Sequence, residues 1–169
     1  MKLYILGDYI GLYAPMILFI LTLFLLRNMP TYLQFYVAGT ILNNILNIIL
    51  KLIIKQPRPN DDQKAIEIGV VNGSRISFDK FGMPSGHAQN CGYNLVFINL
   101  TLNNIFISTL YALITIISLL QRYMRKNHTI LQLVVGIFVG IGIGYLTYVL
   151  GNKFIMGNIK MKKDDNAPL

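Results

Sequence analysis

Long apolar runs separated by short polar segments dominate the amino-acid pattern of this chain. Residues 9–26 carry no charge, and charged residues are also missing from residues 28–50 and 88–121. Runs of this length suit helices that cross a lipid bilayer, which need about 20 mostly apolar residues. Turn-forming residues such as Pro30 and Asn103-Asn104 separate the runs. The pattern therefore predicts five helices, at residues 9–26, 32–55, 84–102, 105–120 and 129–151.

The composition supports this membrane interpretation. Hydrophobic residues make up 54% of the 169 residues and charged residues only 13%, against roughly 25% charged residues in soluble domains. A soluble core of the same size would intersperse Lys and Glu along its helix faces. We therefore predict an all-α integral membrane helical bundle with about five transmembrane helices, in a single domain over residues 1–151. Residues 152–169 are predicted to form a polar tail.

The first apolar run has an alternative interpretation as a cleaved signal peptide, because Lys2 precedes it. Small residues at a cleavage spacing do not follow the run, and Arg27-Asn28-Met29-Pro30 comes instead. A retained transmembrane helix is therefore the favoured interpretation.

Polar residues recur on one face of the second predicted helix. Asn44, Asn47 and Lys51 follow one another at steps of three and four, and Arg58 lies seven residues beyond Lys51. Residues with this spacing share a helix face. Polar groups at membrane depth need partners inside the bundle or in a wet cavity. We expect this face to point inward, with the asparagines joining helices and the two cations at its end.

The fifth predicted helix carries a second repeat, in which His128, Gln132, Gly136, Gly140 and Gly144 recur every four residues. Small residues four apart let helix backbones approach closely in membranes. We expect the glycines to pack against another helix and to set the depth of His128 and Gln132.

The predicted topology gathers the chemically useful side chains on one side of the membrane. With five spans, the N-terminus, residues 56–87 and residues 121–128 share that side. They bring together cations, the start of the third helix and the two histidines of the chain. A helix start offers backbone N–H groups and a positive dipole end, so this combination suits a phosphate group. The candidate phosphate ligands are Lys51, Arg58, Ser85, Gly86 and Arg122, and the candidate catalytic residues are His87, His128 and Gln132.

Two histidines in one cluster suit either a metal site or acid–base chemistry. Zinc would want further Cys or carboxylate ligands, and Cys91 lies one turn beyond His87. Three neighbouring cations would repel the metal, so neither a metal nor another cofactor is predicted. The favoured alternative is covalent phosphoryl transfer, with His128 as the nucleophile and His87 as the general acid. Gln132, one turn after His128, can accept a hydrogen bond from Nδ1–H and keep Nε2 available.

The net charge of +8 does not by itself indicate nucleic acid. In a membrane protein it suits anionic lipid surfaces or anionic substrates, and the aromatic–basic alternation of single-strand binders is missing from the sequence. The predicted partners are the membrane and a lipid phosphate substrate, with no nucleic acid.

At these residues the chain resembles the type 2 phosphatidic acid phosphatase (PAP2) superfamily, which includes the vanadium haloperoxidases. The three family motifs are Lys, six residues, Arg-Pro; Pro-Ser-Gly-His; and Ser-Arg, five residues, His, three residues, Asp. The resemblance covers roughly residues 32–151 and implies a PAP2-like helical core and a metal-independent lipid phosphatase. The matching residues are Lys51 with Arg58-Pro59, then Pro84-Ser85-Gly86-His87, then Arg122 with His128.

Two positions depart from the general pattern, since Gln121 stands where Ser is usual and Gln132 stands where Asp is usual. A neutral Gln can orient the imidazole but stabilises its positive charge less. His128-Thr129-x-x-Gln132 is similar to the variant in dolichyl diphosphatases and plastid-type lipid phosphate phosphatases, and residues 81–89 resemble the dolichyl diphosphatase form of the second motif. This similarity implies a polyprenyl diphosphate substrate. It also implies an endoplasmic reticulum-type membrane in a eukaryotic or viral source, whereas a bacterial source implies the plasma membrane.

The sequence therefore predicts an enzyme that hydrolyses a polyprenyl diphosphate through a phosphohistidine, with phosphatidic acid or another lipid phosphate as the alternative substrate. A binder or scaffold for phosphate lipids without turnover is a second hypothesis, which Gln121 and Gln132 raise. A small transporter or channel built on the inward asparagines is a third, although an inverted repeat is not visible in the sequence.

Overall fold

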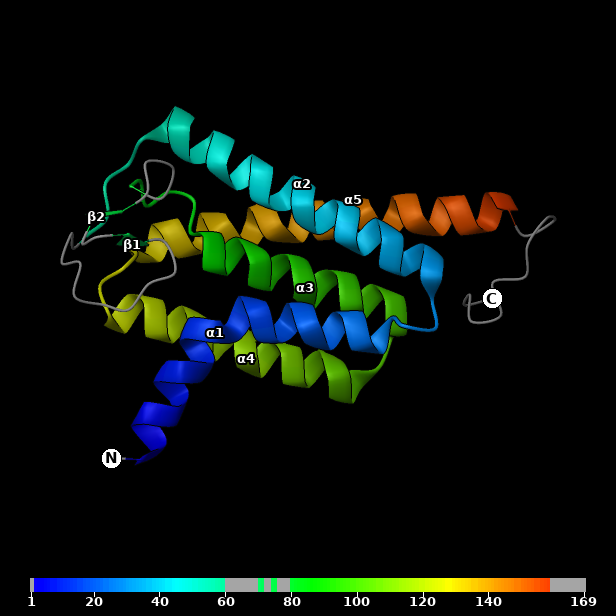
Figure 1. Cartoon of the computed structure of the whole chain (residues 1–169), viewed down its shortest axis with the longest axis horizontal. Helices are drawn as coiled ribbons and strands as arrows, with labels where there is room; N and C mark the ends of the chain where they lie inside the picture. The colour runs from blue at the N-terminus through cyan, green and yellow to red at the C-terminus, as the bar shows by residue number, and fades with distance from the viewer. Residues whose placement is uncertain (1, 60–69, 72–73, 76–79, 159–169) are drawn as a thin grey trace.

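The computed structural model of the chain describes residues 2–59, 70–71, 74–75 and 80–158. Most of these residues lie in helices, and the predicted all-α bundle is confirmed (Figure 1). Two strands of two residues each, β1 (Val70–Val71) and β2 (Ser74–Arg75), pair antiparallel between the second and third helices. The helices are α1 (Lys2–Leu25), α2 (Pro30–Ile54), α3 (Gly86–Leu102), α4 (Ile105–Met124) and α5 (Ile130–Asn158).

The centre of the bundle is α3, which packs against all four of the other helices. Its neighbours α1, α2, α4 and α5 are each long and apolar enough to cross a membrane. With 17 residues and many polar side chains, α3 falls short of that standard. The surrounding helices shield α3 from lipid. Its polar groups can therefore bond to the neighbouring helices, whereas lipid would offer them no hydrogen-bond partner.

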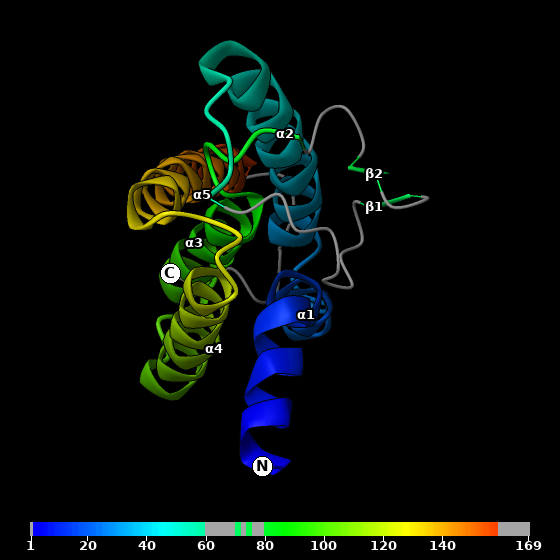
Figure 2. The same ribbon diagram turned by 90° about the vertical axis from the view of Figure 1, so that its left-hand side faces the viewer.

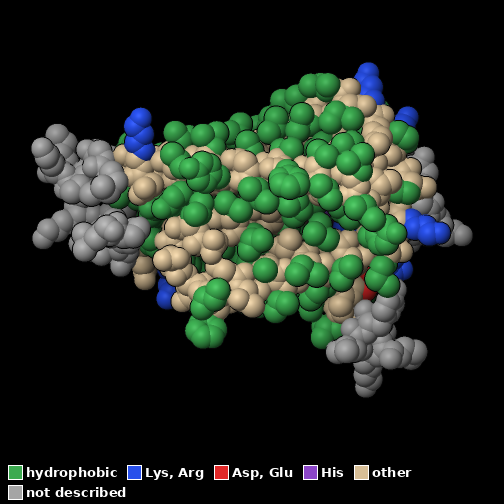
Figure 3. All heavy atoms as spheres, turned by 180° about the vertical axis from the view of Figure 1, so that it is seen from behind, with side chains coloured by type: hydrophobic (Ala, Val, Ile, Leu, Met, Phe, Trp, Pro, Cys, Tyr) green, Lys and Arg blue, Asp and Glu red, His purple; other side chains and the backbone are tan. Residues whose placement is uncertain are grey.

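The outer surface of the bundle is apolar along its length. Large hydrophobic side chains on the outward helix faces are strongly exposed, for example Ile53 at 70% and Phe138 at 68%. Figure 3 shows hydrophobic side chains across one whole face, with Lys and Arg side chains toward its two ends. A soluble protein rarely leaves so much apolar surface uncovered. The arrangement fits a multi-pass protein whose outer faces contact lipid.

The glycine repeat of α5 packs against the backbone of α3. A Cβ atom at Gly136 would lie 2.6 Å from the Ser85 carbonyl oxygen, and one at Gly144 would lie 2.8 Å from the Tyr93 carbonyl oxygen. At Gly140, between them, a Cβ would fall onto the Gln89 carbonyl. The predicted close approach of α5 to another helix is thus confirmed, and the partner is α3.

Local backbone conformations explain where α3 and α4 meet. Asn103 adopts a left-handed conformation with φ of 45° and ends α3, a role that Asn fills more readily than most residues. The Asn104 side chain accepts hydrogen bonds from the backbone N–H groups of Phe106 at 3.0 Å and Ile107 at 3.2 Å, so it caps α4. The predicted turn at Asn103-Asn104 is confirmed.

Several helix bounds differ from the predicted ones, and α1 already begins at Lys2, before the predicted residue 9. Helix α2 stops at Ile54, where Lys55 takes a left-handed φ of 52°, so Arg58 lies beyond the helix and not on its face. The predicted end of the fourth helix at residue 120 is wrong, because α4 continues to Met124. Helix α5 continues past residue 151 to Asn158, because Ile155, only 5% exposed, still packs into the core. The predicted tail beyond residue 158 lies outside the described residues.

The inward face of α2 contains Asn47 and Lys51 as predicted, but Asn43 takes the place of Asn44. Asn43, Asn47 and Lys51 are buried, whereas Asn44 is exposed. Asn44 bonds to Asn90 at the edge of the α2–α3 contact. The prediction for Asn44 was wrong because steps of four from Gly39 carry the buried face through Asn43.

Candidate active site

All the predicted site residues lie at one end of the bundle. The C-terminal ends of α2 and α4 and the N-terminal ends of α3 and α5 meet there, at the left of Figure 1. The α1–α2 and α3–α4 turns lie at the opposite end (Figure 1). We call the group formed by Lys51, Arg58, Ser85, Gly86, His87, Arg122 and His128 the anion site.

His128 precedes α5 and is held by Gln132, one turn into that helix. Nδ1 of His128 lies 3.1 Å from Oε1 of Gln132. The other end of the Gln132 amide donates from Nε2 to the Pro57 carbonyl oxygen at 2.8 Å. Because a carbonyl can only accept, this bond fixes which atom of the amide is the oxygen. His128 therefore carries its hydrogen on Nδ1, and its Nε2 holds the lone pair.

Arg58 approaches that lone pair directly. Its Nη1 lies 3.0 Å from Nε2 of His128, and since a guanidinium only donates, the bond runs from Arg58 to the imidazole. Burial of His128, which is 3% exposed, and then the positive charges of Arg58 and Lys51 hold its pKa well below the ordinary value of 6.5. The imidazole is therefore neutral near pH 7, which is the form that can act as a nucleophile.

The second histidine, His87, lies in the first turn of α3 and faces α4 and α1. Its Nε2 is 2.9 Å from Nη2 of Arg122 and 2.9 Å from the backbone carbonyl oxygen of Leu12. Arg122 is 2% exposed, and its charge also contributes to the lowered pKa of His128. Arg122 therefore contacts His87 directly and acts on His128 only through its charge.

The start of α3 is tied to the start of α5. Ser85 caps α3, and its Oγ accepts a hydrogen bond from the Ala88 N–H at 3.4 Å. The Ser85 backbone N–H donates to the Gln132 carbonyl oxygen at 3.1 Å. Gly86 is the first residue of the helix, where N–H groups have no partner within the helix itself. This placement is suited to receiving an anion.

A buried network of side-chain amides lies next to Lys51, one turn earlier along α2. Asn47 donates to Oε1 of Gln89 at 2.8 Å and to the Pro84 carbonyl at 3.3 Å. Gln89 donates in turn to the carbonyl and side-chain oxygens of Asn43 at 2.8 and 2.9 Å. Lys51 follows one turn beyond Asn47 and is 4% exposed. The network joins α2 to α3 and so sets the height of the lysine relative to the Ser85 cap.

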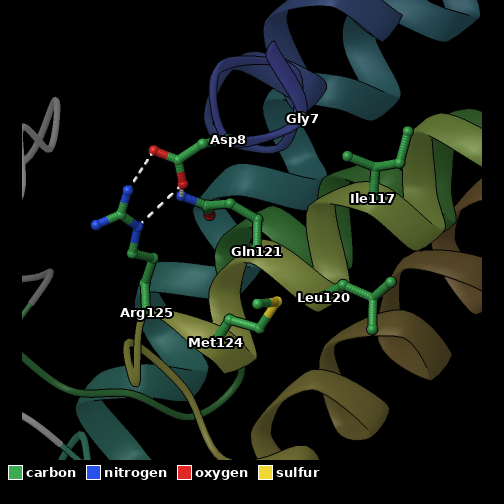
Figure 4. A pocket seen from close by; sticks show the side chains of 7 residues that line it. All are labelled: Gly7, Asp8, Ile117, Leu120, Gln121, Met124 and Arg125. Carbon is green, nitrogen blue, oxygen red and sulfur yellow. Dashed lines mark hydrogen bonds and ion pairs between the residues drawn. The ribbon is translucent and has the colours of Figure 1, made fainter. Parts of the chain in front are cut away.

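Gln121 points away from the anion site. Its Nε2 donates to Asp8 of α1 at 3.0 Å, and Asp8 also forms an ion pair with Arg125 at 2.6 Å. Figure 4 shows these side chains beside a cavity of about 180 Å³ between α1 and α4. None of the anion-site residues lines this cavity. The residues that line it are Gly7, Asp8, Ile117, Leu120, Gln121, Met124 and Arg125.

The third ligand weighed for a zinc site lies elsewhere. Cys91 is fully buried in the hydrophobic core. Over residues 2–59 and 80–158, with the two short strands, no three His, Cys, Asp or Glu side chains gather in a group that could hold a metal. The polar chemistry of the anion site comes from cations and amides, which are donors to an anion.

Sequence reasoning missed two groups of the site, the Gln56 side chain and the Leu12 carbonyl, and Gly82 of the recognised 81–89 stretch packs beside Gln132. Gln56 accepts from Nε2 of Gln132 at 3.1 Å, and the Gly82 N–H donates to the Gln56 carbonyl at 2.8 Å. A Cβ at Gly82 would come within 2.6 Å of Oε1 of Gln132, so a larger residue there would displace the Gln132 amide. The position of Gln56 beside the Pro57–Pro59 segment was a usable signal. The Leu12 carbonyl left none, because every residue has a carbonyl.

The chain is similar to known proteins over most of its length. A family model described as the PAP2 superfamily matches residues 32–156. A protein of Schizosaccharomyces pombe named "Palmitoyl-protein thioesterase-dolichyl pyrophosphate phosphatase fusion 1" is 26% identical over 156 residues. That match covers 85% of this chain and 23% of the relative, so the chain spans less than a quarter of the relative's length. No solved structure matches the chain.

Proposed function

Because the chain belongs to the PAP2 superfamily, we propose that it is a membrane phosphatase that removes phosphate from a lipid phosphate or diphosphate. The observation that carries this proposal is the fixed tautomer of His128, whose Nε2 lone pair faces Arg58. A neutral imidazole held beside three cations is suited to attack a phosphorus atom whose oxygens those cations hold.

The proposed reaction has two steps. Nε2 of His128 forms a bond to phosphorus while the bond from phosphorus to the leaving oxygen breaks, and His87 gives that oxygen a proton. A water oxygen then bonds to phosphorus while His87 takes a proton from the water and the bond from phosphorus to Nε2 breaks, which releases inorganic phosphate and returns the electron pair to His128. Lys51, Arg58 and Arg122, with Ser85 and the Gly86 N–H, hold the phosphate oxygens in both steps. The cations neutralise the phosphoryl charge, so we propose that a metal ion is not required.

The substrate that we propose is a polyprenyl diphosphate of the dolichyl type, cleaved to the monophosphate. Two observations support this choice. Gln132 replaces the usual Asp in the form similar to dolichyl diphosphatases, and the relative in S. pombe carries dolichyl pyrophosphate phosphatase in its name. Phosphatidic acid is the alternative substrate, because the same cation cluster suits a phosphate monoester.

A substrate panel with purified protein in detergent tests the proposal. Dolichyl diphosphate, undecaprenyl diphosphate and phosphatidic acid are supplied with EDTA, and phosphate release is measured. We expect release from the polyprenyl diphosphates with metal chelated. We expect His128→Ala to lower kcat by at least about 10³-fold without loss of the folded state, checked by thermal unfolding.

The outcomes separate the candidate functions. Turnover that persists in His128→Ala would rule out the phosphohistidine mechanism. Tight binding of dolichyl diphosphate with no turnover over hours would favour the non-catalytic binder. If only phosphatidic acid is hydrolysed, the substrate is a phosphate monoester and not a polyprenyl diphosphate, and the proposed mechanism is unchanged.

A further inference from the structure

Helix α1 contributes directly to the anion site, although it lies outside the family match at residues 32–156. Its contact is a backbone one, from the Leu12 carbonyl oxygen to Nε2 of His87 at 2.9 Å. Carbonyls inside a helix normally accept from an N–H one turn later in the same helix. The Leu12 carbonyl also contacts a side chain of another helix, so the local conformation of α1 must expose it.

Pro15 explains that local conformation. Proline has no N–H, and its ring crowds the carbonyl four residues earlier, which here belongs to Gly11. The Gly11 carbonyl instead accepts a hydrogen bond from Oγ of Ser118 in α4 at 3.0 Å. Figures 1 and 2 show that α1 changes direction, with its N-terminal part turned away from the rest of the bundle. Leu12 is adjacent to Gly11, so its carbonyl lies in the turn that the proline ring distorts, and it lies 2.9 Å from Nε2 of His87.

We infer that the Pro15 bend in α1 positions His87 for proton transfer, acting through the Leu12 carbonyl. The inference rests on the proposed function, in which His87 is the general acid. Pro15 and Leu12 are positioning residues, because neither touches the substrate in this scheme. Helix α1 then belongs to the catalytic apparatus and is more than a membrane anchor.

The two contacts of Nε2 explain how the Leu12 carbonyl can position His87 for proton transfer. A neutral Nε2 with a lone pair can accept from Arg122, whereas a protonated Nε2 can donate only to the Leu12 carbonyl. A phosphate that draws the Arg122 N–H groups to its oxygens frees Nε2 for the carbonyl. With Nε2–H held by Leu12, the proton to be transferred is the one on Nδ1. The Nδ1–H bond breaks as the leaving oxygen takes the proton and keeps the electron pair of its bond to phosphorus.

The charged groups around His87 come from several elements. Arg122 of α4 is in direct contact with it. The same end of the bundle also holds Lys51 in the last turn of α2, Arg58 beyond that helix and neutral His128 before α5. In α1, Asp8 lies one turn before Leu12, but its carboxylate is held by Arg125. The Leu12 carbonyl is thus a neutral acceptor beside an imidazole nitrogen whose other close contact is the cation Arg122.

The substitution Pro15→Ala tests this inference, because alanine restores the N–H and removes the ring that bends the helix. Gly7→Ala is the matched control in the same helix, since a Cβ at Gly7 would meet nothing within 4 Å. Each variant is assayed with phosphatidic acid, the alternative substrate, because its alcohol leaving group needs a proton, and with 4-nitrophenyl phosphate, whose leaving group does not. We expect Pro15→Ala to lower kcat for the lipid by about 10²-fold, the size of a general-acid effect. The nitrophenyl ester should change less than about threefold.

A second readout does not depend on turnover. The chain has two histidines, so ¹⁵N-histidine labelling gives two imidazoles, and His128→Ala assigns them. With inorganic phosphate bound, Pro15→Ala should move the ¹⁵N signal of Nε2 of His87, whereas Gly7→Ala should not, and the His128 signals should stay in place in both variants. An unchanged His87 signal in Pro15→Ala overturns the inference, as do equal losses on the two substrates. Turnover in His128→Ala would instead remove the proposed mechanism and leave the spectroscopic result standing.

Discussion

Nη1 of Arg58 lies 3.0 Å from Nε2 of His128 and donates to its lone pair. The pair at the other histidine is similar, since Nη2 of Arg122 lies 2.9 Å from Nε2 of His87. Each imidazole thus contacts an arginine that can also bind phosphate oxygens. A phosphate that binds the Arg58 guanidinium would draw it away from His128. The Nε2 lone pair of His128 would then be available next to that phosphate.

The contact between Arg58 and His128 predicts a pH effect. Burial and then the charges of Arg58 and Lys51 lower the pKa of His128 well below 6.5. A protonated imidazole has no lone pair, so kcat/KM should fall only at pH values well below 6.5. Arg58→Gln removes one repelling charge, raises the pKa of His128 and so moves this acid limb to higher pH. The measurement is kcat/KM from about pH 4.5 to 8 with one substrate for both proteins.

Arg125→Gln is the control for this experiment. Arg125 lies at the same end of the bundle but is paired with Asp8, so its loss should leave the acid limb in place.

The same pKa predicts a stability effect. Below about pH 6.5 the unfolded chain binds a proton at His128 that the folded chain does not, so the free energy of unfolding should fall with decreasing pH. Above that pH this group should contribute no slope. An acid limb that stays in place in Arg58→Gln would contradict the assignment of the limb to His128.

Ser85 has two roles that substitutions can separate. Ser85→Ala removes the cap of α3 and should lower the free energy of unfolding by about 1 kcal/mol. Ser85→Asp keeps a capping acceptor but adds a negative charge among the phosphate ligands. We expect Ser85→Asp to unfold at a higher temperature than Ser85→Ala and yet to lose at least about 100-fold in kcat/KM, as expected when a charged ligand meets a like charge. Thermal unfolding and phosphate release measure the two effects. Full activity in Ser85→Asp would remove Ser85 from the anion site.

The glycine repeat predicts a stability effect at Gly140. A methyl group there would fall onto the Gln89 carbonyl, so Gly140→Ala should push α5 away from α3. We expect a loss of about 1–3 kcal/mol, typical of overpacking, and reduced activity because Gln132 and Ser85 are separated. Gly142→Ala is the matched control, since a Cβ at Gly142 meets nothing within 4 Å. Equal thermal stability of the two variants would show that the α3–α5 contact tolerates a wider spacing.

Local patterns in the sequence were enough to predict the parts of the site that lie within one helix. His128 lies just before α5 and Gln132 lies in its first turn, so their contact follows from the local geometry of a helix start. The cap at Ser85 and the turn at Asn103-Asn104 follow from residue chemistry in the same way. Hydropathy placed the helix ends together, because each apolar run must cross the same thickness of membrane.

The pairing of residues across helices was decided only by tertiary packing. Arg58 could have met either histidine, and its contact with His128 depends on where α2 ends and how the following segment turns. The rotation of α2 against α3 decides which of its asparagines face inward, and it buries Asn43 while it leaves Asn44 exposed. The Leu12 carbonyl contact depends on the bend of α1. Hydropathy determines which segments are buried in the membrane, but it does not encode the rotation and register between helices, and a backbone carbonyl has no residue identity to read.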